Sequence, residues 1–148
     1  MSSTIPIPVA NLVASLGANP EVAKEIQNLL LPDYDVVHMC IDSTTASTEL
    51  PALCSGNTDT APASGLGSNA GKPAAERKVP KAVIFGGGVT DEQAQAVSQA
   101  VSAVAPQIKT VRVTREDIMA AGATGPNPEV IVKVLREKLG ALVERGEL

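Results

Sequence analysis

The chain has almost no aromatic side chains: one Phe, one Tyr and no Trp among 148 residues. A core without them must be built from Val, Ala, Leu and Ile, which favours β-branched strands beneath helices with small side chains. The same scarcity removes the stacking platforms on which single-stranded nucleic acids bind. A formal net charge of -4 also repels phosphate backbones. Nucleic acid is therefore not expected as a partner.

Cysteine, histidine and long apolar runs are scarce as well. There are two cysteines, Cys40 and Cys54, and one histidine. No stretch reaches the roughly 18 apolar residues of a membrane span, and the N-terminal segment, interrupted by Pro6 and Pro8, has no basic leader. We therefore expect a cytoplasmic protein with reduced thiols and no membrane contact. One His and two Cys at unsuited spacings do not make a closed ligand set, so no metal site is expected.

Apolar residues follow strand-like and helix-like patterns in alternation along the chain. The patterns predict strands at 9–16, 34–42, 81–88 and 109–114, and helices at 20–30, 43–54, 90–105, 115–121 and 128–145. Strands that alternate with helices form parallel sheets with right-handed crossovers. We predict one α/β domain over residues 1–148: a four-stranded parallel sheet in the order 2-1-3-4 with helices on both faces, a Rossmann-like or flavodoxin-like three-layer sandwich.

Residues 55–80 lose all apolar periodicity and are rich in Gly, Ser, Pro and Ala, which predicts a long loop. Within it, SGLGSNAG (64–71) has three glycines that permit close backbone approach. Its side chains Ser64, Ser68 and Asn69 can hydrogen-bond a ligand. The loop is interpreted as a lid over a ligand site; the alternative is a flexible or disordered segment.

The second predicted strand raises a question about partners. The order 2-1-3-4 places residues 34–42 at an edge, yet they are as apolar as a buried strand. An uncovered apolar edge invites pairing with another chain. Either the 55–80 loop covers this edge or a second subunit does. We expect a homodimer formed through this strand and the loop, since closed twofold assemblies are the commonest oligomers.

A hexapeptide occurs twice, as GANPEV at residues 17–22 and as GPNPEV at residues 125–130. In both copies Asn suits the N-cap of a helix and Pro suits the first helical position. Glu then complements the positive end of the helix dipole, and Val begins the buried face. The flanking sequences share no pattern, which argues against a duplicated domain. We predict two helix starts; a ligand-binding signature used twice is the alternative.

A parallel sheet binds its ligands beyond the carboxyl ends of its strands, where neighbouring connections run in opposite directions. In the predicted order this crevice lies between the first and third strands. Its expected lining comprises Gly17, Asn19, Gly86, Gly87 and Gly88, with Asp42 at the end of the second strand.

Asp42 resembles the acidic residue that holds a ribose in the dinucleotide-binding fold. The resemblance stops at the fold, because GANPEV has only the first glycine of G-x-G-x-x-G and Pro20 stiffens the turn. Acidic residues in the first helical turns, such as Glu21 and Asp91, also repel a phosphate. No cofactor is expected, and NAD(P) or a nucleotide is kept as an alternative ligand.

His38 and Cys40 lie two residues apart on one predicted strand, so both point to the same face, with Asp42 beyond them. One interpretation is a nucleophilic pair in which His38 activates the thiol. A mid-strand position beneath a helix disfavours a thiolate and blocks a substrate. Buried packing is therefore the favoured interpretation.

These patterns predict a cytoplasmic α/β protein that binds a neutral or weakly acidic organic molecule in the crevice. As an enzyme it would be a cofactor-independent isomerase, cyclase or lyase, with Asp42 transferring the proton and Ser68 and Asn69 orienting the substrate. Two alternatives stay open. One is a non-catalytic homodimeric interaction or scaffold protein, and the other is a nucleotide-binding or NAD(P)-binding domain.

Overall fold

The computed structural model describes residues 11–17, 19–31, 33–86, 89–122 and 127–147. Its elements are β1 (Asn11–Leu16), α1 (Pro20–Leu30), β2 (Tyr34–Cys40), α2 (Ser43–Cys54), a 3-10 turn (Ala74–Glu76), β3 (Ala82–Phe85), α3 (Asp91–Val104), β4 (Lys109–Arg112), α4 (Arg115–Ala120) and α5 (Pro128–Glu144). Each predicted strand and helix has a counterpart among them. The second, third and fourth strands end earlier than predicted, and residues 87–88 lie outside the described part.

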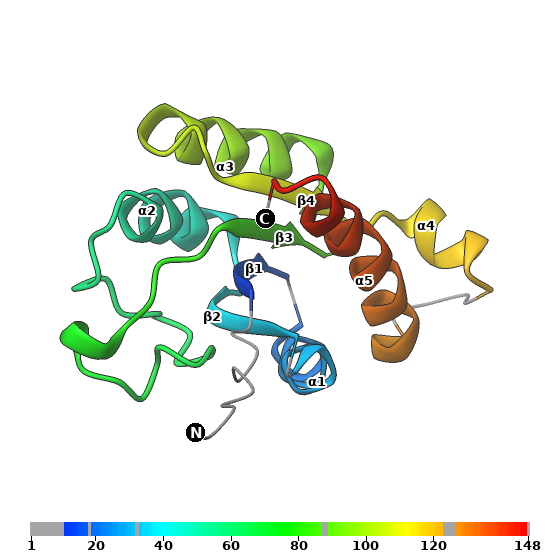
Figure 1. Cartoon of the computed structure of the whole chain (residues 1–148), viewed down its shortest axis with the longest axis horizontal. Coiled ribbons are helices and arrows are strands. Elements are labelled where there is room, and N and C mark those ends of the chain that lie inside the picture. The colour runs from blue at the N-terminus through cyan, green and yellow to red at the C-terminus, as the bar shows by residue number, and fades with distance from the viewer. Residues whose placement is uncertain (1–10, 18, 32, 87–88, 123–126, 148) are drawn as a thin grey trace, which may run out of the picture.

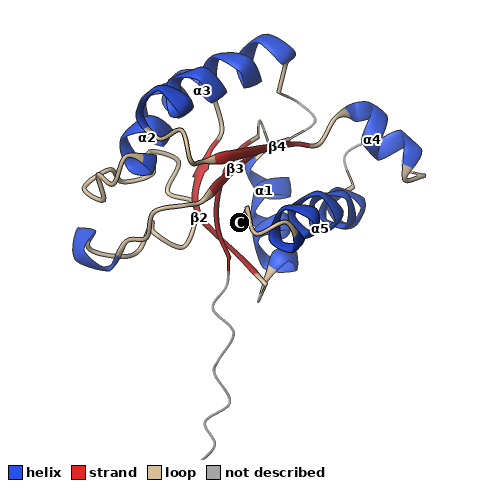
Figure 2. Ribbon diagram, turned by 45° about the horizontal axis from the view of Figure 1, so that its top comes forward, coloured by secondary structure: helices blue, strands red, loops and turns tan. Residues whose placement is uncertain are grey.

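The four strands form one sheet in the order β2-β1-β3-β4, and all three neighbouring pairs are parallel. Helices α2 and α3 cover one face, and α1 and α5 cover the other, with α4 beside α5 (Figure 1). A second view shows the same layers (Figure 2). The predicted α/β class, strand order and three-layer arrangement are confirmed.

Both faces of the sheet are packed, as parallel strands require. Successive residues of one strand enter opposite halves of the core: Val13 packs beneath α1 and α5, whereas Ala14 packs beneath α2 and α3. In β3, Ile84 belongs to the same half of the core as Val13, and Phe85 belongs to the same half as Ala14. This alternation fixes which strand residues lie under which helices. Among the described helices, none combines the length and apolar character needed to cross a membrane.

The repeated hexapeptide marks two helix starts, as predicted. Asn19 caps α1, and its Oδ1 accepts from the amides of the residues two and three positions later, at 3.0 and 3.2 Å. Asn127 caps α5 in the same way, at 3.0 and 3.4 Å. Pro occupies the first helical turn in both copies. The similarity is therefore explained by helix capping.

Removal of the Asn127 cap is expected to lower the free energy of unfolding. Asn127→Ala leaves two amides at the start of α5 without their acceptor and should cost about 1 kcal/mol. Asn127→Asp keeps the acceptor and should change stability by less than about half that amount. Urea denaturation monitored by circular dichroism measures both. Equal stability of the two variants would contradict a capping role.

The 55–80 loop covers the outer edge of β2. The amides of Ser68 and Asn69 donate to the carbonyls of Val36 and Val37 at 3.0 and 2.9 Å, and the amide of Met39 donates to the Leu66 carbonyl at 3.3 Å. The loop lies beside β2 in two different views (Figures 1 and 2). Of the two covers considered for this edge, the loop is the one observed.

A register shift in β2 explains how the loop fits so closely. Val13 of β1 pairs with Val36, but the next residue of β1 pairs with His38, so Val37 is left over as a bulge. Gly67 lies against the backbone at this bulge: a Cβ placed on Gly67 would meet the Val37 carbonyl oxygen at 2.5 Å. Glycine is therefore required where the loop crosses the edge.

Candidate functional site

At the carboxyl edge of the sheet, where a crevice was predicted, β1, β2 and β3 end side by side. The Gly17 amide donates to the Cys40 carbonyl at 3.0 Å, and the Gly86 amide donates to the Leu16 carbonyl at 2.9 Å. A Cβ placed on Gly86 would lie 3.7 Å from the Gly17 Cα. Gly17 and Gly86 are thus neighbours at the point where the connections from β1 and β3 diverge. Gly87 and Gly88 lie outside the described residues.

Gly17 has open space beside it. A Cβ placed there would find no atom within 4 Å, and the backbone of Gly17 does not require glycine. Packing within the described residues therefore gives no reason for a missing side chain at this position. The Asn19 side chain points to its own helix and caps α1.

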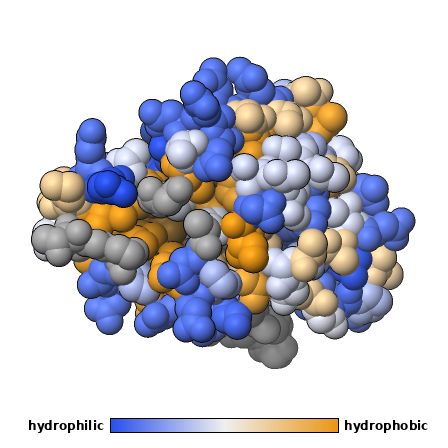
Figure 3. Space-filling view, turned by 180° about the vertical axis from the view of Figure 1, so that it is seen from behind, coloured by the Kyte–Doolittle hydropathy of each residue, from blue (hydrophilic) through white to orange (hydrophobic). Residues whose placement is uncertain are grey.

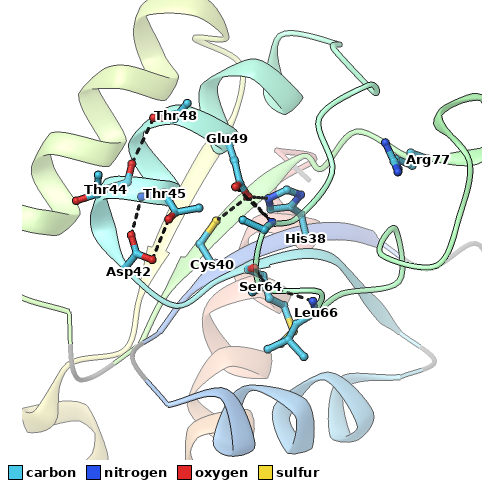
Figure 4. A network of polar contacts seen from close by, with 12 residues as sticks. His38, Cys40, Asp42, Thr44, Thr45, Thr48, Glu49, Ser64, Leu66 and Arg77 are labelled. Carbon is cyan, nitrogen blue, oxygen red and sulfur yellow. Dashed lines mark hydrogen bonds and ion pairs between the residues drawn. The ribbon is translucent and has the colours of Figure 1, made fainter.

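Asp42 is the N-cap of α2. Its carboxylate accepts from the Thr45 amide at 2.7 Å and from the Thr45 hydroxyl at 2.8 Å (Figure 4). The hydrogen bond from the Thr45 amide lowers the pKa of Asp42 most, and the bond from the Thr45 hydroxyl lowers it further. Asp42 is exposed. Asp42 is therefore a carboxylate at neutral pH and a weak base. Its role in proton transfer stays a prediction.

His38 and Cys40 meet a third polar residue that the sequence analysis did not include, Glu49 of α2. His38 Nε2 lies 2.7 Å from Glu49 Oε1, and Cys40 Sγ lies 3.9 Å from the same oxygen. The Ala63 amide, from the 55–80 loop, donates to both Glu49 oxygens at 3.3 Å. Figure 4 shows the three side chains turned toward one another between β2 and α2.

Burial determines the protonation of this cluster. It lowers the pKa of His38, and the hydrogen bond that His38 donates to Glu49 opposes that shift only in part. Burial also raises the pKa of the Cys40 thiol far above its usual range, with smaller contributions from the charges of Glu49 and Asp42. The imidazole is therefore neutral and the thiol protonated at neutral pH. A protonated thiol is a poor nucleophile, which favours the packing interpretation of the pair.

A pattern in the sequence indicates the inward position of Glu49. It is the only charged residue between Ser43 and Cys54, in a segment predicted to be a helix. Helices of soluble proteins usually carry several charges on their outer face. A lone carboxylate in such a helix, close to Leu50 and Leu53 of the core, is the pattern expected of an inward-facing acid.

The polar residues of the loop are bonded within the fold. Ser64 Oγ donates to the Met39 carbonyl and accepts from the Leu66 amide. Asn69 is fully buried, and its amide group bonds to the carbonyl and the amide of Lys78 at 2.9 and 3.0 Å. Ser68 Oγ is buried and has no hydrogen-bond partner among the described residues. These contacts join the loop to β2 and to itself, and none of them reaches β1 or β3.

A separate cavity lies between α4 and α5 and has a volume of about 290 Å³. Its lining is Asp117, Ala120, Ala121, Lys133, Val134, Glu137 and Lys138. Lys138 Nζ donates to the Asp117 carboxylate at 2.8 Å, and this contact lowers the pKa of Asp117 to about 2. The rear view shows apolar side chains between polar ones on the side of α4 and α5 (Figure 3), and Met119 of α4 is 62% exposed.

The fold defines the class of this protein as an α/β sandwich with a parallel sheet in the order 2-1-3-4. No family model matches the chain, and neither a curated protein nor a solved structure matches it.

Proposed function

We propose that the chain binds a small, neutral or weakly acidic organic molecule at the carboxyl edge of the sheet, between β1 and β3. The observation that carries the proposal is the open space beside Gly17 where its backbone meets that of Gly86. Ligands of parallel α/β folds bind at this divergence of connections. Missing side chains let a ligand approach the backbone closely.

The helix starts near this edge support a ligand without a full negative charge. An anion binds at a helix start through amides that have no other partner. At α1 the Asn19 side chain already accepts from two amides, and at α3 Thr90 forms a capping box with Gln93. The first turn of α3 also carries Asp91 and Glu92, which repel an anion. A phosphate-bearing cofactor such as NAD(P) is therefore the weaker alternative.

If the chain is an enzyme, we propose a cofactor-independent acid/base reaction in which Asp42 transfers the proton. Asp42 follows β2, whose end lies beside Gly17. Its low pKa makes it better suited to accept a hydrogen bond than to remove a proton from a weak acid. Ligand binding thus has more support than catalysis. The free thiols Cys40 and Cys54 are compatible with the reducing cytoplasm, where we place the protein.

A homodimer is the second expectation, and it loses its main support because the loop occupies the β2 edge. Light scattering on the full chain tests it directly. A monomer across the micromolar range would remove the dimer from consideration.

The binding proposal predicts a specific effect of Gly17→Val. A panel of neutral polar compounds, weak organic acids, nucleotides and NAD(P)H is screened by thermal shift, and we expect a neutral or weakly acidic compound to raise the melting temperature. At a ligand concentration of 100 Kd the native state gains about 2.7 kcal/mol. Gly17→Val fills the open space and should abolish this shift while leaving the melting temperature without ligand nearly unchanged.

Gly71→Val is the matched control, because a Cβ at Gly71 also meets no atom within 4 Å but the residue lies in the 55–80 loop. This variant should keep the full ligand-induced shift. The binding proposal fails if no compound raises the melting temperature, or if Gly17→Val responds like the wild type.

A further inference from the structure

We propose that His38, Cys40 and Glu49 form a binding site for one divalent transition-metal ion of the Zn²⁺ class. Each residue offers one ligand atom, and the three atoms lie within 4.8 Å of one another. The ligands come from two elements, β2 and α2, which lie next to each other (Figure 4). This site is separate from the proposed ligand crevice and does not depend on it.

The distances suit a tetrahedral ion after a small adjustment. With Zn–N and Zn–O distances of about 2.0 Å and a Zn–S distance of about 2.3 Å, tetrahedral ligand atoms lie about 3.3 to 3.5 Å apart. Cys40 Sγ and Glu49 Oε1 are 3.9 Å apart, whereas His38 Nε2 and Glu49 Oε1 are 2.7 Å apart and must separate. Binding therefore requires the Glu49 carboxylate, which also accepts from the Ala63 amide, to move away from His38 Nε2.

The chemistry of the donors selects the class of ion. A thiolate, an imidazole and a carboxylate together suit Zn²⁺ and its neighbours in the first transition row, whereas Mg²⁺ and Ca²⁺ prefer ligand sets made of oxygen. Three protein ligands leave a fourth position for a water molecule, as in catalytic zinc sites. The thiolate and the carboxylate balance the two charges of the ion, so the complex is neutral where it is buried.

Without an ion, this buried polar cluster contributes less to the stability of the fold than apolar side chains would. His38 and Cys40 are buried, and the Glu49 side chain beside them is largely buried too. Apolar side chains of similar volume at these positions would stabilise a core at least as well as a buried polar cluster. A polar cluster buried in this way therefore calls for a physical reason. A bound metal ion supplies one, because it converts all three polar side chains into ligands.

The proton balance of binding is simple. The neutral imidazole donates through Nε2 to Glu49, so coordination by Nε2 moves that proton to the unbonded Nδ1. The Cys40 thiol loses its proton to solvent, and one proton leaves for each ion bound. The ion can approach past Glu49, whose side chain is 13% exposed.

Arg77 is the positive charge that faces this cluster. Its positive charge also repels a cation, and the negative charges of the Cys40 thiolate and the Glu49 carboxylate offset that repulsion in the complex. The guanidinium group itself is held by the carbonyls of Thr58 and Asp59, at 3.1 and 3.3 Å. The expectation of no metal site counted His and Cys alone and missed Glu49, which the packing of α2 brings beside them.

Cobalt(II) substitution tests the proposal on the full-length chain. The protein is stripped with a chelator and titrated with Co²⁺, whose bond to a thiolate gives a charge-transfer band in the near ultraviolet. We expect one Co²⁺ per chain with this band, and its displacement by Zn²⁺. Zn²⁺ at about 100 Kd should also raise the melting temperature of the chain by about 5 to 10 °C.

Cys54 provides a matched control, since it is the other buried free cysteine of the chain. Cys40→Ser should lose the charge-transfer band, whereas Cys54→Ser should keep it. Glu49→Gln should keep the band and weaken Co²⁺ binding by about tenfold or more. This variant retains the shape of Glu49, so it tests the site even if Cys40→Ser fails to fold.

The absence of a stoichiometric thiolate-to-cobalt band in the wild type would overturn the proposal. So would a band that persists in Cys40→Ser or disappears in Cys54→Ser. Unchanged Co²⁺ affinity in Glu49→Gln would show that the carboxylate is not a ligand, which would refute the three-residue site.

Discussion

Gly67→Ala is expected to lower the free energy of unfolding by about 3 to 5 kcal/mol, a large effect for a change of one methyl group in a loop. Two causes combine. The backbone of Gly67 has a φ of +103°, which costs any other residue energy, and a Cβ would lie 2.5 to 2.8 Å from backbone atoms of Val37 and His38. These atoms belong to β2 and cannot move aside independently. Urea denaturation measures the change.

Two other glycines of the same loop separate these causes. Gly65 has a φ of +71° but open space around it, so Gly65→Ala should cost only about 1 kcal/mol. Gly71 has neither a positive φ nor a close neighbour, and Gly71→Ala should stay within about 0.5 kcal/mol of the wild type. If Gly67→Ala cost no more than Gly65→Ala, the contact between the loop and β2 would not be rigid.

Asn69→Ala should lower the free energy of unfolding by about 2 to 4 kcal/mol. The fully buried side chain bonds to both the amide and the carbonyl of Lys78, so its removal leaves two backbone groups without a partner. Asn57→Ala is the control, because this exposed side chain accepts from the Asp59 amide and its loss should cost less than about 1 kcal/mol. Chemical denaturation of both variants gives the comparison.

The Asn69 variant also distinguishes two roles. A structural residue lowers stability when removed, whereas a ligand-binding residue lowers only the response to a ligand. If Asn69→Ala kept its stability and lost the ligand-induced thermal shift, the role predicted for Asn69 from the sequence would hold and the structural one would not.

The sequence predicted the topology because the apolar periodicities of the elements were strong and local. Val111 is buried between the more accessible Thr110 and Arg112, which is the alternation expected of an edge strand. The helix starts at Asn19 and Asn127 were also predictable, since capping depends on neighbours three residues away at most.

The path of the 55–80 loop and the partner of His38 were not predictable in this way. The loop has no apolar period, and its position depends on the fit of Gly67 to a bulge at Val37, a contact between residues far apart in sequence. Likewise, Glu49 reaches His38 only after α2 has packed on β2. A pattern within one segment holds no information about such contacts between segments.

The attachment of residues 66–69 to β2 has a consequence for how molecules of this protein meet. As long as the attachment holds, the apolar strand offers few free hydrogen-bonding groups to a neighbouring chain. A neighbour that uses this edge must first displace the loop and break its bonds. Contacts of that kind will form slowly, and a nick in the loop or a weakened Gly67 turn will favour strand-to-strand aggregation.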